Sequence, residues 1–164
     1  MTRGLRIAAI GSLCSLLLLG TGAAAGAEEV QVRAVAGVAT LSTIPPKVKQ
    51  ECHIQQDLSA SVVANAPNAK LAQKKPSSGL YLDLVVTEVH APGGGVFSGP
   101  KWIAARGTLQ RGEKKLRSFR AERRSGGPFT GTCAMLAKAT SAMGKDIAGW
   151  LADENAGSLL GDAR

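Results

Sequence analysis

The sequence contains few aromatic residues, histidines and cysteines. Its 164 residues include three Phe, two Trp and one Tyr, with two His and three Cys. Proteins that bind single-stranded nucleic acid usually stack the bases on aromatic side chains, so we expect no specific nucleic-acid partner. Zinc sites need Cys and His ligands at characteristic spacings, and no such spacing occurs. We therefore expect no metal site and no cofactor.

Acidic residues are also scarce, and none lies in the first 27 residues. This segment has two arginines among its first six residues, continues with an apolar stretch and ends Ala25-Gly26-Ala27. These features are typical of a secretory signal peptide, and the apolar stretch is too short to span a bilayer comfortably. We predict cleavage after Ala27, with export to the periplasm or the cell exterior. A lipid anchor on Cys14 is the alternative, but Leu13 stands where a lipoprotein signal has a small residue.

The chain after the predicted cleavage is basic. Residues 28–164 keep 18 of the 20 Lys and Arg and all 12 Asp and Glu, which gives a net charge of 18 − 12 = +6. A basic exported domain favours anionic partners such as phospholipid head groups, lipopolysaccharide or acidic proteins. The partner that we expect is therefore an envelope protein or an anionic envelope component.

Two cysteines remain after cleavage, Cys52 and Cys133. An even count in an exported domain predicts a disulfide, which would stabilise the fold by about 4 kcal/mol through closure of a long loop. The alternative is a thiol enzyme in which Cys133 uses His90 or His53 as its base. The predicted disulfide argues against this alternative, and we assign no catalytic residue.

Hydrophobic periodicity predicts an α+β domain. Alternating apolar residues indicate strands over 80–89, 102–109 and 116–123, where short links such as the charged turn at 111–114 favour an antiparallel meander. A weaker alternation over 28–41 predicts a further strand.

Apolar stripes at helical spacing over 47–66 and 132–152 predict two helices, each with one cysteine on its buried side. We expect a mainly antiparallel sheet of three or four strands with both helices on one face and one disulfide. The predicted organisation is a signal peptide over 1–27, one domain over 28–153 and a flexible tail over 154–164.

The glycine-rich connection over 90–101 is one candidate binding segment. It is longer than the usual hairpin loop, and long loops are often functional. Its glycines do not form a phosphate loop of the known kind, because such a loop leads into a helix and this one leads into a strand. It is either a binding loop that uses His90, Phe97 and Lys101 or a flexible connection.

A basic run over 111–124 is the other candidate, with seven cations in fourteen residues. Strand alternation places Arg117 and Arg123 on one face and Arg120 on the other. Such cations can protect an edge strand from unwanted pairing or bind an anionic surface. The candidate binding residues from both segments are His90, Phe97, Lys101, Arg120, Arg123 and Arg124.

Four stretches of the chain carry a resemblance to a known group. They are ECHIQQDLSASVV, VTEVHAPGGGVFSGPK, FRAERRSGG and GTCAMLAKATSAMGKDIAGWL. Together they resemble a group of small, exported, uncharacterised proteobacterial proteins, and more loosely the small α+β domains of envelope accessory lipoproteins. The resemblance implies that Cys52 and Cys133 pair and that 90–100 is a shared loop, and it implies no activity.

These observations favour an exported cell-envelope protein that binds an anionic or protein partner and does not catalyse a reaction. The alternative is a small enzyme or inhibitor with a site in the 90–101 loop around His90.

Overall fold

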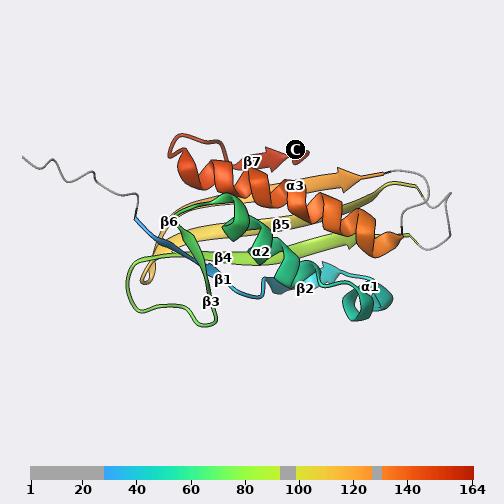
Figure 1. Cartoon of the computed structure of the whole chain (residues 1–164), viewed down its shortest axis with the longest axis horizontal. Coiled ribbons are helices and arrows are strands. Elements are labelled where there is room, and N and C mark those ends of the chain that lie inside the picture. Colours follow the sequence, from blue (N-terminus) through green and yellow to red (C-terminus); the bar gives the residue numbers. More distant parts are fainter. Residues whose placement is uncertain (1–27, 93–98, 127–130) are drawn as a thin grey trace, which may run out of the picture.

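The structure is a computed structural model that describes residues 28–92, 99–126 and 131–164 (Figure 1). The predicted signal peptide and Phe97 lie outside the described residues. The helices are α1 (Pro46–Glu51), α2 (Ile54–Asn65) and α3 (Thr132–Ala152). The strands are β1 (Val30–Arg33), β2 (Gly37–Thr43), β3 (Ala69–Ala72), β4 (Leu80–His90), β5 (Lys101–Arg111), β6 (Lys114–Ser125) and β7 (Leu159–Gly161).

The strands form one mixed sheet in the order β3-β1-β4-β5-β6-β7, with β2 also paired to β4. The predicted antiparallel meander is confirmed as β4, β5 and β6. The expected total of three or four strands was wrong, because β1, β2, β3 and β7 add parallel pairings at the two sides. The α+β class is confirmed, and the sheet is larger and more mixed than predicted.

Short segments account for most of the difference. The single strand predicted over 28–41 is interrupted, and its two parts pair with β4 at Leu80–Leu82 and at Val85–Val86. The polar stretch that we expected to be a loop contains β3, which is four residues long. The predicted flexible tail contains β7, whose register on β6 is fixed by a 2.8 Å hydrogen bond from the Arg120 amide to the Ser158 carbonyl.

The first predicted helix is also interrupted. Cys52 has extended backbone angles (φ −114°, ψ 132°), so α1 ends there and α2 begins at Ile54. The second predicted helix is confirmed over its full length as α3. The break lies beside the start of α3, where Cys52 and Cys133 form the predicted disulfide with their Cα atoms 5.2 Å apart.

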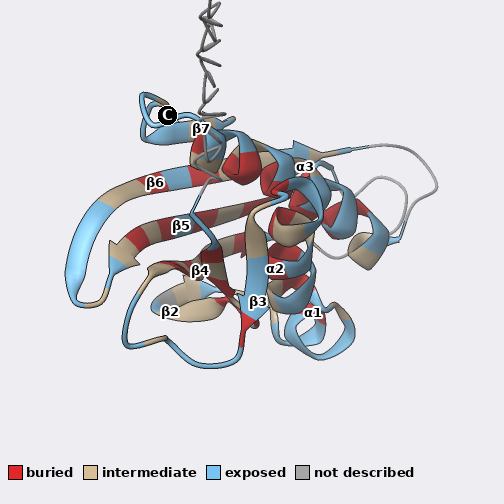
Figure 2. Cartoon of the chain, turned by 60° about the vertical axis from the view of Figure 1, so that its left-hand side comes forward, coloured by how far each residue is buried: buried red, intermediate tan, exposed pale blue. Residues whose placement is uncertain are grey.

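The hydrophobic core lies between the sheet and the two longer helices, α2 and α3, which cross the same face (Figure 1). Buried and partly exposed residues alternate along β5 (Figure 2). Among the described residues, no helix covers the opposite face, and no helix is long and apolar enough to cross a membrane. The largest fully buried apolar side chains are Leu58, Leu82, Leu84, Ile103, Leu136, Met143, Ile147 and Trp150.

The two long helices approach each other closely at Gly144 of α3. A Cβ atom at this position would lie 2.8 Å from the carbonyl carbon of Ser61 on α2 and would also overlap its side chain. The Ser61 hydroxyl donates a 3.2 Å hydrogen bond to the Ser141 carbonyl at the same crossing. A side chain at position 144 would therefore force the helices apart.

This close approach yields a prediction with a matched control in the same helix. Gly144→Ala should lower the free energy of unfolding by about 1–3 kcal/mol, because overpacking displaces the neighbouring backbone. Gly149→Ala should raise it by about 0.5–1 kcal/mol, since a Cβ there meets no atom within 4 Å and alanine is the better helix former. Urea unfolding of both variants measures the difference, and equal effects would contradict the close packing.

Candidate functional site

Strand β6 separates the basic run into two groups with different roles. Arg117 faces the helices, where its guanidinium carbon lies 4.1 Å from the centre of the Trp150 ring. It also donates hydrogen bonds of 3.1 and 2.9 Å to the carbonyl oxygens of Trp150 and Asp153, at the C-terminal end of α3. This cation therefore stabilises the end of a helix, where the helix dipole favours positive charge.

Arg123 lies on the same face of β6 and is also engaged. Its Nε and a terminal nitrogen donate hydrogen bonds of 2.5 and 2.7 Å to the two carboxylate oxygens of Asp146 on α3. A second carboxylate, that of Asp162, lies 3.6 Å away. The hydrogen bond to Asp146 raises the pKa of Arg123 above its ordinary value, with burial acting in the opposite direction. Arg123 joins the sheet to α3 and does not lie on the open face.

Two residues of the glycine-rich connection occupy different environments. Lys101 is 2% exposed, and its ammonium donates a 3.1 Å hydrogen bond to the Pro92 carbonyl. It is therefore a buried structural residue and not a surface contact. His90 is exposed and stacks on Trp102, with the ring centres 5.4 Å apart and the planes at 12°.

The remaining predicted cations lie on the face that the helices leave open. Arg124 is the cross-strand partner of Trp102 and forms a 2.9 Å ion pair with Glu122. Arg120 also belongs to this face. It lies four residues before Arg124 along β6, and strand alternation places Arg120, Glu122 and Arg124 on the same side. The structure thus brings His90, Arg120 and Arg124 to one face, while Lys101 and Arg123 are elsewhere.

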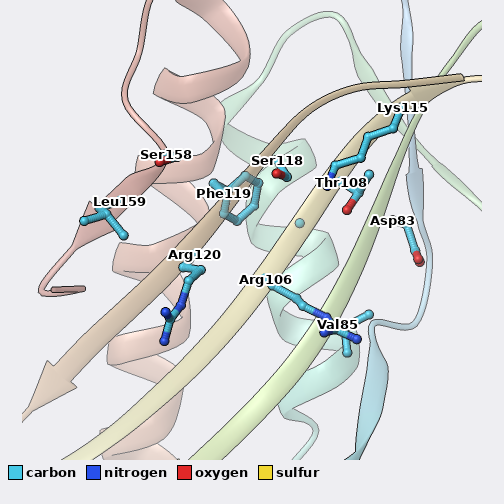
Figure 3. A pocket seen from close by; sticks show the side chains of 11 residues that line it. Asp83, Val85, Arg106, Thr108, Lys115, Ser118, Phe119, Arg120, Ser158 and Leu159 are labelled. Atoms are coloured by element: carbon cyan, nitrogen blue, oxygen red, sulfur yellow. The ribbon is translucent and has the colours of Figure 1, made fainter.

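A shallow depression of about 430 Å³ lies on this open face (Figure 3). Of its cations, Arg106 lies outside the predicted binding segments, and Lys115 belongs to the basic run but was not among the named binding residues. Arg106 and Lys115 join Arg120 there. The depression extends from β4 across β5 and β6 to the segment before β7. It is lined by Asp83, Val85, Arg106, Gly107, Thr108, Lys115, Ser118, Phe119, Arg120, Ser158 and Leu159.

Arg106 and Arg120 are directly opposite each other on neighbouring strands. Both are exposed, and within the described parts of the chain neither guanidinium group has a hydrogen bond or an ion pair. Like charges directly opposite on a sheet repel and destabilise it. Consistent with this repulsion, Figure 3 shows Arg106 extending toward Val85 on β4, whereas Arg120 extends away from it along β6.

The other polar groups of the depression are mostly hydroxyls. On the same face, the next cross-strand pair after Arg106 and Arg120 is Thr108 and Ser118. In Figure 3 the Lys115 side chain reaches toward Thr108. The one carboxylate in the lining belongs to Asp83, which is engaged by Arg33 at 2.8 Å. The depression therefore offers hydrogen-bond donors and positive charge to an incoming anion.

No protein-family model and no curated protein matches this chain. Several solved structures have a similar chain trace at low identity. A DUF330 family protein from Xanthomonas campestris is 15% identical, with 75% of this chain and 82% of that chain covered and a TM-score of 0.47. The PelC dodecamer from Paraburkholderia phytofirmans is 13% identical, with 72% and 86% covered and a TM-score of 0.44.

A putative lipoprotein from Caulobacter crescentus is 14% identical, with 70% of this chain and 90% of that chain covered and a TM-score of 0.38. These similarities carry no information on a binding site or an activity of this chain.

The division of cations by face predicts opposite effects on stability. Arg123→Gln should lower the free energy of unfolding by about 1–2 kcal/mol, since a charged, partly buried hydrogen-bonded pair is lost. Arg120→Gln should change it by less than about 0.5 kcal/mol or raise it, because a like-charge contact is relieved. Chemical denaturation of the two single variants measures this, and equal losses would contradict the assignment of Arg123 to structure and Arg120 to the open face.

The pKa of Tyr81 yields a second prediction. Burial raises the pKa of Tyr81 above its ordinary value of 10.0, and the nearby Asp83 carboxylate adds to the shift while Arg33 opposes it. Above about pH 10 the unfolded chain therefore loses this proton before the folded chain does, and the free energy of unfolding falls as pH rises. Tyr81→Phe removes this contribution.

Thermal unfolding between pH 8 and pH 11 tests the point. The wild-type melting temperature should fall more steeply above pH 10 than that of Tyr81→Phe. Parallel curves would show that the phenol has the same pKa in both states.

Proposed function

We propose that this protein is an exported binding domain that docks an anionic partner on the open face of its sheet. The observation that carries the proposal is the group of three cations around the depression, Arg106, Lys115 and Arg120. Among the described residues, none of the three forms an ion pair, although eight acidic residues pair with other cations. The disulfide and the basic composition of the chain support export and an anionic partner.

The position of these cations favours binding over a purely structural role. They lie on a face that no described helix covers, and they border a hollow rather than filling a gap in the core. Unpaired cations in a concave surface concentrate their field there and raise the association rate of an anionic partner. The aromatic pair His90 and Trp102, at the far end of the same face, extends the surface that a large partner can contact.

The enzyme alternative has less support from the geometry. Catalysis by His90 would need a second group within hydrogen-bond reach, and among the described residues its contact is the stacking on Trp102. In the same part of the chain, no group of three His, Cys, Asp or Glu residues could hold a metal ion. A binding role is therefore the function that we propose.

Chromatography on immobilised dextran sulfate tests this function. The protein beginning at Glu28 should be retained and should elute with salt. The triple variant Arg106→Gln, Lys115→Gln and Arg120→Gln should bind about tenfold more weakly at 0.1 M salt, because the cations that form direct contacts are lost.

A matched triple variant separates this site from net charge. The control variant combines Lys49→Gln, Lys138→Gln and Lys145→Gln. It loses the same charge from exposed positions on α1 and α3, away from the open face. It should elute close to the wild type. If both triple variants weaken binding equally, only net charge matters and the proposed docking face is wrong.

A further inference from the structure

We infer that the depression on the open face is a phosphate site, in which Arg106 and Arg120 together hold the phosphate group of a monoester ligand. This inference rests on the proposed function and specifies the ligand chemistry of the same surface. The argument starts from the cross-strand arrangement of the two arginines. In the structure they lie directly opposite each other on β5 and β6. The described residues provide no counterion for either arginine.

Phosphate matches this arrangement better than carboxylate does. One arginine can satisfy both oxygens of a carboxylate with its two parallel N–H groups. A phosphate monoester carries close to two negative charges at neutral pH and has three terminal oxygens. It therefore needs two guanidinium groups and further donors, and the site supplies both arginines within one depression.

The remaining donors come from the neighbouring positions of the same strands. Within the described chain, the hydroxyls of Thr108 and Ser118 have no hydrogen-bond partner. These two residues form the next cross-strand pair on the same face as the arginines. Lys115 reaches toward Thr108 and adds a third positive charge (Figure 3). The carboxylate of Asp83, at the border of the depression, is held by Arg33, so its repulsion of an anion is reduced.

The divergence of the two arginine side chains is part of the same inference. Without an anion they repel each other and extend in different directions, as Figure 3 shows. A bound phosphate would remove the repulsion, and both flexible side chains could then turn toward it. Without a ligand, the domain should therefore be less stable with both arginines than without them. Stabilisation by bound phosphate, in contrast, should require both arginines.

Thermal unfolding of the protein beginning at Glu28 tests the inference. Sodium phosphate should raise the melting temperature above that in sodium chloride of equal ionic strength, by about 3–6 °C at ten times the dissociation constant. In the variant Arg106→Gln with Arg120→Gln, the melting temperature without phosphate should be unchanged or higher, and the phosphate-dependent rise should be lost. The control variant Lys138→Gln with Lys145→Gln should retain the rise.

A charge-conserving variant distinguishes this inference from the proposed function. Arg106→Lys with Arg120→Lys keeps the charge but loses the planar pairs of N–H donors. It should bind dextran sulfate as the wild type does, and its affinity for phosphate should fall about tenfold. The phosphate site is wrong if the Arg→Gln and Arg→Lys double variants both keep the phosphate-dependent rise in melting temperature. It is also wrong if phosphate has the same effect as chloride. In either case, binding to dextran sulfate still tests the proposed docking face independently.

Two further measurements keep the test independent of variant folding and identify the source of the phosphate. In the wild type, backbone amide NMR signals of residues 106–108 and 118–120 should shift on addition of phosphate, and shifts elsewhere alone would overturn the site. Binding to vesicles containing phosphatidic acid, displaced by free phenyl phosphate, would support a lipid phosphate ligand. Binding of phenyl phosphate without vesicle binding would support a soluble one.

Discussion

The contact between β6 and α3 is the interaction on which the rest of the structure depends. Along β6, the residues that face the helices are Arg117, Phe119, Ala121 and Arg123. Phe119 meets the edge of the Trp150 ring at 4.8 Å between centres, and the arginines on either side bind the end and the middle of α3. A Cβ atom on Gly107 of β5 would overlap the Phe119 ring, so the glycine provides the space that this contact needs. Once α3 is held on this side, the alternate residues of β6 must face away from the core.

The parts of the fold that the sequence predicts well are those in which one periodic pattern extends over many residues. In β4, Leu82, Leu84 and Val86 are all fully buried, so their alternation identifies both the strand and its buried face. Helix α3 has a stripe that continues for 21 residues. The strands that were missed have three or four residues, as in β3 and β7, and form parallel pairs with partners far away in sequence. Segments this short contain at most two repeats of the strand period. Their structure depends on the strands with which they pair, β1 for β3 and β6 for β7.

The candidate site was only partly predicted, for a reason that is visible in the register of β5 and β6. The turn pairs Arg111 with Lys114 and Gln110 with Lys115. If this register continued, Arg106 would be opposite Phe119. Leu116 instead forms a bulge, which shifts all later pairs by one residue and places Arg106 opposite Arg120. Bulges are common at functional sites because they redirect side chains, but the sequence around Leu116 contains no glycine or other signal for one.

The open face combines features that lower the stability of the domain with others that compensate for them. An uncompensated cross-strand arginine pair is destabilising, and so is a sheet face that no described helix covers. Stabilising contacts are concentrated on the other side, where the disulfide holds the starts of α2 and α3 together and Arg123 ties β6 to Asp146. Deviations from the most stable arrangement usually mark functional positions in an otherwise consistent fold. In this domain the deviations gather at one depression, and the stabilising contacts lie on the other side of the sheet, so that this face is open to solvent.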